Sequence, residues 1–180
     1  PPQVTETRPK SLVCDVVRFQ NNKERWVAFV GLLDGYPYEI FTGVLDDEDG
    51  IALPKTVTKG HIVKNIDEDG NKSYYYTWSE IGEPHGVDCW AMVDSVGDAN
   101  VVGLIHSHPN GKGFSTGDVQ QARDERDSVH TIYLVEPQKK GDASSYNIRK
   151  LEENGHGWEK EKSEYLRNEN GSIYTGLTKP

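Results

Sequence analysis

Two histidines stand one residue apart where an apolar run ends, in the stretch VVGLIHSHPNGKGFSTGD from Val101 to Asp118. Alternate residues of a strand point to the same side, with about 6.5 Å between their α-carbons, so His106 and His108 can bind one ion. Asp118 follows a glycine-rich loop that can fold back toward them. Two histidines and a carboxylate leave one position open, which is typical of a catalytic zinc site. Water bound there would become acidic enough to attack a carbonyl group.

The same stretch has a second interpretation, in which its polar residues only begin a helix. Ser115 as the N-cap and Asp118 at the third helical position form a capping box. Under this interpretation His106 and His108 merely end a strand. The full order of strand, H-x-H-P, glycine-rich loop, serine, aspartate, helix and strand favours the metal site, with capping as at least a partial role of Ser115.

The elements that must position these residues follow from the apolar patterns of the chain. β-Branched and aromatic runs separated by turn residues predict a three-stranded meander, followed by two further strands. Around the histidines, the pattern predicts strand, helix, strand and strand. The predicted strands are 11–19, 25–33, 36–43, 56–66, 72–78, 100–108, 131–137 and 145–152, and the predicted helix is 117–128. Residues 87–95 fit either a short helix or a strand.

The motif HSHP…S..D, from His106 to Asp118, resembles the signature of the JAMM/MPN metalloprotease family. The resemblance covers about residues 69–152 and extends especially to the DUF4329-type modules of bacterial polymorphic toxin proteins. It implies a zinc-dependent peptidase or isopeptidase that hydrolyses an amide bond in a peptide or protein. It also implies that His106, His108 and Asp118 hold Zn²⁺ and that Ser115 stabilises the oxyanion of the tetrahedral intermediate.

JAMM enzymes also use an upstream glutamate that takes the proton from the zinc-bound water. Its expected place falls near residues 57–59, where no carboxylate stands. Glu39, in a predicted strand, and Glu83, in a predicted loop, are the alternatives, and each is also explained as an ordinary solvated carboxylate. His61 is either a third imidazole near the site or a surface or half-buried histidine. Without a general base, the module would bind zinc and peptide but hydrolyse slowly or not at all.

A second resemblance covers the first half of the chain. It is carried by RPKSLVCDVVRFQNNKERWVAFVGLLDGYPYEIFTG and by the segment through TVTKGHIVKNIDEDGN. Residues 8–71 resemble the C-terminal TSCPD-type region of bacterial ribonucleotide reductase large subunits, especially vitamin B12-dependent forms. That region lies outside the catalytic barrel, and no barrel cysteine is matched here. The resemblance implies an alternative function, a non-catalytic accessory or interaction domain or a fragment related to the reductase large subunit.

Together these patterns predict an α+β fold, with a mixed β-sheet, few helices, and a JAMM/MPN-like second half preceded by a strand-rich segment. Four regions are expected: a tail at 1–10, the reductase-like β segment at 11–70, a metal-binding domain at 71–153 and a peripheral segment at 154–180. The strands of the first region could form their own small unit or complete the sheet of the second.

The net charge of -9 opposes nucleic-acid and anionic-membrane partners and favours cationic or neutral ones. A peptide or protein substrate is what the JAMM resemblance implies. The apolar runs are too short to span a bilayer. Cys14 and Cys89 lie outside any C-x-x-C pattern, which indicates neither a disulfide scaffold nor a sulfur-ligated zinc site. A reducing, cytoplasmic compartment is predicted, with a secreted toxin-associated setting as the alternative. Because the first residue is not Met, an excised or processed segment is expected.

Overall fold

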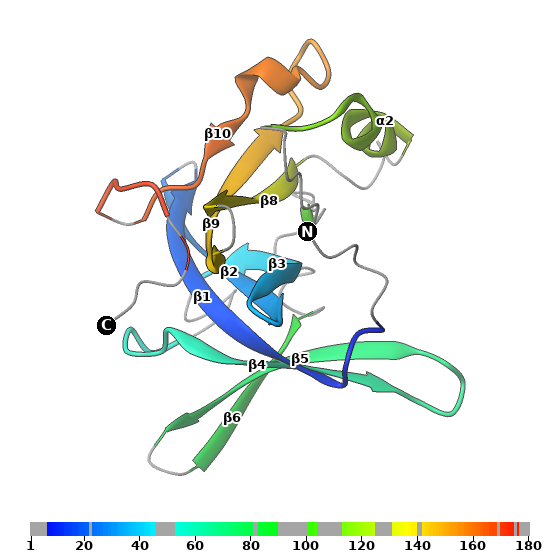
Figure 1. Cartoon of the computed structure of the whole chain (residues 1–180), viewed down its shortest axis with the longest axis vertical. Coiled ribbons are helices and arrows are strands. Elements are labelled where there is room, and N and C mark those ends of the chain that lie inside the picture. The colour runs from blue at the N-terminus through cyan, green and yellow to red at the C-terminus, as the bar shows by residue number, and fades with distance from the viewer. Residues whose placement is uncertain are drawn as a thin grey trace.

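The computed structural model describes most of the chain as two β-sheets, one α-helix and a short 3-10 helix, η1 (Figure 1). The described residues are 7–21, 23–45, 53–80, 83–89, 101–103, 113–124, 131–139, 142–168, 170–174 and 176. The elements are β1 (Ser11–Asn21), β2 (Glu24–Leu33), β3 (Tyr36–Val44), β4 (Lys59–Ile66), β5 (Lys72–Glu80), β6 (Glu83–Asp88), β7 (Val101–Gly103), α2 (Thr116–Asp124), β8 (Thr131–Lys139), β9 (Asp142–Glu152), η1 (Lys160–Lys162) and β10 (Glu164–Tyr165).

The first sheet has six antiparallel strands in the order β3-β2-β1-β4-β5-β6. The predicted meander of β1, β2 and β3 is confirmed, with a tight turn at Asp34 and Gly35, both at positive φ. β4 then pairs with the other edge of β1, and a second turn leads into β5. In that turn, Asp67 Oδ1 accepts hydrogen bonds from the backbone N–H groups of Asp69 and Asn71 at 2.9 and 2.8 Å. The region boundary expected at residue 70 therefore falls inside the β4–β5 hairpin.

The second sheet has four strands in the order β10-β9-β8-β7. β7 and β8 run parallel and are connected through α2, whereas β8 and β9 form an antiparallel hairpin. The predicted succession of strand, helix, strand and strand between residues 100 and 152 is confirmed by β7, α2, β8 and β9. α2 covers the outer face of this sheet, where Phe114, Val119 and Ala122 pack with Ile132 and Leu134.

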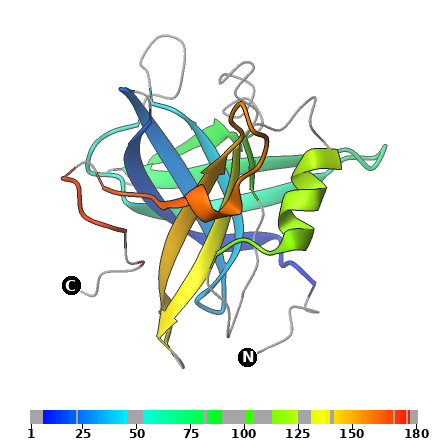
Figure 2. The ribbon, with the colours of Figure 1, turned by 90° about the horizontal axis from the view of Figure 1, so that it is seen from above.

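The inner face of the four-stranded sheet packs on the meander of the first sheet. Figure 2 shows β8 and β9 crossing β1 and β2. Since alternate residues of a strand share a face, the layer takes alternate residues from the strands that meet in it, such as Val17 and Phe19 of β1 and Tyr133 and Val135 of β8. The layer contains Val17, Phe19, Trp26, Ala28, Val30, Leu32, Ile40, Tyr133, Val135, Tyr146, Ile148 and Leu166.

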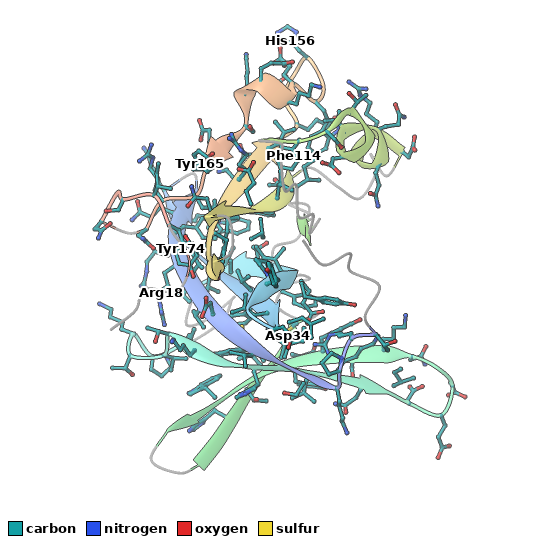
Figure 3. All side chains as sticks on the ribbon, viewed as in Figure 1. Arg18, Asp34, Phe114, His156, Tyr165 and Tyr174 are labelled. Carbon is teal, nitrogen blue, oxygen red and sulfur yellow. The ribbon has the colours of Figure 1, made fainter. Side chains whose placement is uncertain are left out.

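One carboxylate lies within this apolar layer. Asp15 is 3% exposed, and its Oδ2 accepts hydrogen bonds from the hydroxyls of Tyr146 and Tyr174 at 2.6 and 3.3 Å. The two hydroxyls are 3.0 Å apart. Burial raises the pKa of Asp15, and the two tyrosine hydrogen bonds oppose that rise. Asp15 thus joins β1 to β9 and to the C-terminal segment, where Tyr174 lies beside them (Figure 3).

The six-stranded sheet is strongly curved, so that on its opposite face residues from β2 and β3 pack against residues from β5. Phe29 of β2 stacks on Tyr76 of β5 with ring centroids 4.0 Å apart, although three strand boundaries separate β2 from β5 in the sheet. Phe41 of β3 likewise meets Tyr74 of β5 at 5.2 Å. The enclosed core consists of Cys14, Val16, Val27, Phe29, Leu45, Leu53, Val57, Ile62, Tyr76 and Cys89.

The predicted α+β class is wrong, because the structure is mostly antiparallel β-sheet and its described part has one α-helix. The helix at α2 was recognised correctly, but it covers one face of the smaller sheet only. The undecided segment at 87–95 begins as the end of β6, and its residues after Cys89 lie outside the described part. The C-terminal segment, expected to be peripheral, supplies the buried side chains Trp158 and Leu166 to the two layers of the smaller sheet.

Gly60 allows the sheet to fold over, because a side chain there would collide with β5. A Cβ atom at Gly60 would overlap the carbonyl oxygen of Thr77 and lie 2.6 Å from Tyr76 Cε1. The Gly60→Ala variant is therefore expected to lower the free energy of unfolding by about 3 kcal/mol, measured by urea denaturation. Gly86→Ala is the matched control in the same sheet, since its nearest contacts would be 3.8 and 3.9 Å. Equal stability of the two variants would contradict the close approach of Tyr76 to β4.

Candidate functional site

The predicted metal site is described only at its helical end. His106 and His108 lie outside the described residues, which stop at Gly103 and resume at Gly113. Ser115 and Asp118 stand at the start of α2. Among the residues that the structure describes, no three His, Cys, Asp or Glu side chains form a group that could hold a metal ion. The zinc site therefore stays a prediction.

Ser115 and Asp118 form the predicted capping box, which is confirmed. The N–H of Asp118 donates to Ser115 Oγ at 3.1 Å, and the N–H of Ser115 donates to Asp118 Oδ2 at 2.9 Å. Asp118 is 3% exposed, so this hydrogen bond holds a buried carboxylate at the positive end of the helix dipole. The arrangement fixes the Asp118 carboxylate at the start of α2.

A buried ion pair holds the chain just before α2, and the sequence analysis did not single it out. Glu136 of β8 is 3% exposed and accepts the backbone N–H of Gly113 through Oε2 at 2.6 Å. Its Oε1 accepts Arg149 Nε, also at 2.6 Å. Arg149 in turn donates to the Tyr165 hydroxyl at 2.7 Å and lies 4.2 Å from the centre of that ring. The signal in the sequence was a charged residue at the end of an otherwise apolar strand.

Glu39, the first candidate for the general base, is paired with Arg8. Arg8 Nε and Nη2 donate to its two carboxylate oxygens at 3.0 and 2.6 Å. The other N–H groups of Arg8 reach the carbonyl oxygens of Pro9, Lys10 and Ile62, so the guanidinium is fully hydrogen-bonded. A proton-accepting role for Glu39 would require it to leave Arg8. The strand that carries Glu39, β3, does lie beside β7, the strand that precedes the histidines in the sequence.

The other candidates lie on the six-stranded sheet. Glu83 begins β6, and its side chain is outside the described part. His61 is exposed on β4. Neither position is in a strand of the four-stranded sheet to which β7 belongs.

Both cysteines are buried in the folded-over part of the six-stranded sheet and are free thiols. Burial raises the pKa of Cys14 well above its ordinary value, and it raises the pKa of Cys89 to about 12. The thiol forms are therefore favoured near neutral pH, whereas nucleophiles and metal ligands act as thiolates.

One face of the six-stranded sheet continues beyond the part covered by the four-stranded sheet. Asp15 is buried on this face, but Val13, two residues earlier on β1, is 50% exposed. Register pairs it with His61 of β4, and the neighbouring row contains Val63 and Tyr75, the latter 39% exposed. We call this surface the open face, and its residues are Ser11, Val13, His61, Val63, Tyr75, Thr77, Gly86 and Asp88.

Comparison with known proteins relates the first half of the chain to one family. The family model described as the NrdJ homologue C-terminal domain matches residues 12–87. This match supports the ribonucleotide reductase-like resemblance, and no match supports the JAMM/MPN or DUF4329 resemblance. No curated protein and no solved structure matches the chain. In the described part of the chain, no helix has the length and apolar character to cross a membrane.

Proposed function

We propose that this chain is a non-catalytic accessory domain, related to the reductase C-terminal region, that acts by binding another protein surface. The extent of the family match is the observation that carries this proposal. The match begins at Leu12 in β1 and ends at Val87 in β6, so it coincides with the six-stranded sheet. The related unit is thus a complete folded layer rather than a short shared motif.

The chemistry of this sheet supports a binding role. On its folded-over face, the thiols are buried and protonated, and the Arg8–Glu39 pair has its hydrogen bonds within the chain. These groups stabilise the fold through packing and pairing. Apart from His61 and Asp88, the side chains of the open face are small, aromatic or aliphatic. Surfaces poor in charge are typical of protein interfaces.

Binding can be tested with a NrdJ homologue from which its own C-terminal domain has been removed. Adding the 180-residue chain should give saturable binding, measured by titration calorimetry and by sedimentation. The same homologue with its C-terminal domain intact is the control, and it should bind the chain much more weakly because the site is already occupied. Equal titration curves for both proteins, or no heat and no sedimentation change with either, would contradict the accessory role.

A zinc-dependent hydrolase of peptide or protein amides is the second candidate function. It is favoured by the buried Asp118 carboxylate at the start of α2, in the succession β7, α2, β8, where the sequence between β7 and α2 contains His106 and His108. A buried carboxylate suits a zinc ligand, so the described end of the site fits the ion. Bound zinc would supply Lewis acidity for attack on a carbonyl. In this role Asp118 would hold the metal, Ser115 would orient the polarised oxygen, and Glu39 would accept a proton only after leaving Arg8.

Zinc content tests this second candidate without any assumption about substrate. The chain purified without added metal should contain about one equivalent of zinc, measured by atomic absorption, and His106→Ala and Asp118→Asn should each lose it. His61→Ala is the matched control, because His61 lies on the other sheet, and it should retain the zinc. The same zinc content in the parent chain and in His106→Ala would remove the metal site from the account.

A further inference from the structure

We propose that the open face is the surface through which this domain docks, and that its occupant is the protein body to which such a C-terminal domain is attached. This inference rests on the proposed accessory function and adds the surface, the kind of partner and the strength of the contact. Three features of the described residues carry it: the composition of the open face, its size, and the position of β1 at its edge.

The composition of the open face differs from that of a solvent-exposed sheet surface. Two cross-strand rows run over β1, β4, β5 and β6. One row joins Val13, His61, Thr77 and Gly86, and the other joins Ser11, Val63, Tyr75 and Asp88. Among these eight described positions, only Asp88 is a formally charged residue at neutral pH with histidine neutral. The centres of protein interfaces are likewise poor in charge and rich in aromatic residues.

The aliphatic and aromatic side chains of the open face are contiguous. Val63 lies directly opposite Tyr75 in the β4–β5 register and next to the row that contains Val13. Directly opposed side chains of antiparallel strands are in reach of each other. Val13 and Tyr75 are 50% and 39% exposed, so the apolar centre of the face is accessible to a partner.

The size of the open face limits what can bind to it. Four strands at about 4.8 Å spacing and two rows at about 6.8 Å give roughly 260 Å² on this side of a contact, or about 520 Å² over both partners. A stable complex between free proteins buries about 1,200–2,000 Å². The face is thus too small to hold a separate protein tightly. It suits a partner on the same polypeptide, because a short tether provides an effective concentration in the millimolar range.

The N-terminal end of β1 lies at the open face, so a protein joined there would sit beside that face. Residues 7–10 lead directly into β1, whose first residues, Ser11 and Val13, belong to the open face. Arg8 fixes this segment through its hydrogen bonds to Glu39 and Ile62. A protein body joined ahead of this segment would emerge beside the open face. The description of the matched family as a C-terminal domain agrees with a body that precedes it.

Backbone NMR of the ¹⁵N-labelled 180-residue chain can locate the contact. The probe is the unlabelled NrdJ homologue without its own C-terminal domain. Shifts are expected at the open face, above all on β4 and β5, with a dissociation constant on the order of 100 μM, as befits a contact below standard size. Val13→Lys and Tyr75→Lys should each weaken binding about tenfold or more. Ile66→Lys is the matched control, since Ile66 is 62% exposed in the same sheet but outside the open face.

The outcomes separate this inference from the function on which it rests. If binding shifts the signals of α2 and β8 rather than those of the open face, the open face is not the docking surface, although the accessory role still stands. The same conclusion follows if Ile66→Lys weakens binding as much as Tyr75→Lys does. Concentration-dependent shifts of the open face without the probe would identify a second copy as the occupant and would also overturn the proposal. Thermal unfolding of each variant shows whether it still folds. If Val13→Lys or Tyr75→Lys fails to fold, Val63→Thr, which keeps the β-branched shape, replaces it, and this variant should weaken binding.

Discussion

The packing of the four-stranded sheet on the β1–β3 meander is the constraint on which the rest of the structure depends. It buries Asp15 in an apolar layer, where the hydroxyls of Tyr146 and Tyr174 are its hydrogen-bond donors. Asp15 Oδ1 has no hydrogen-bond partner among the described residues. Keeping a carboxylate there costs free energy, which the aromatic and aliphatic side chains around it must offset. In return, the hydrogen bonds fix β9 and the C-terminal segment in one position on β1.

That position decides which surfaces remain for function. The four-stranded sheet covers β1 only as far as Asp15, so the same face beyond it is left to solvent at Val13. The other face of the six-stranded sheet is buried where it packs on itself, with Phe29 stacked on Tyr76. On the far side of the smaller sheet, Glu136 and Ser115 fix the start of α2. Binding at the open face and chemistry at α2 would therefore occur on different sides of the molecule.

Local patterns in the sequence predicted the elements well but not how the layers are arranged. Turn residues at Asp34–Gly35 and the Ser115–Asp118 pair have short-range causes, and the structure has them as expected. The folded-over sheet depends on Gly60 lying under Tyr76, a long-range contact that no periodicity reveals. The predicted α+β class was wrong because it treated the helix as a main layer of the fold, whereas the structure is mostly antiparallel β-sheet. The pairing of Glu39 with Arg8 was also missed, since the two are far apart in the sequence.

The pH dependence of stability at Asp15 tests the packing of the two sheets most directly. Burial raises the pKa of Asp15 above its ordinary 3.8, so the folded protein binds this proton at a higher pH than the unfolded chain does. The contribution of Asp15 to the free energy of unfolding is thus largest below its ordinary pKa and is lost as the pH rises through the raised value. Urea unfolding of the parent chain and of Asp15→Asn, compared between pH 7 and pH 4, should show the parent gaining stability relative to the variant as the pH falls. Parallel curves, or a relative loss in the parent, would contradict an Asp15 buried between the sheets.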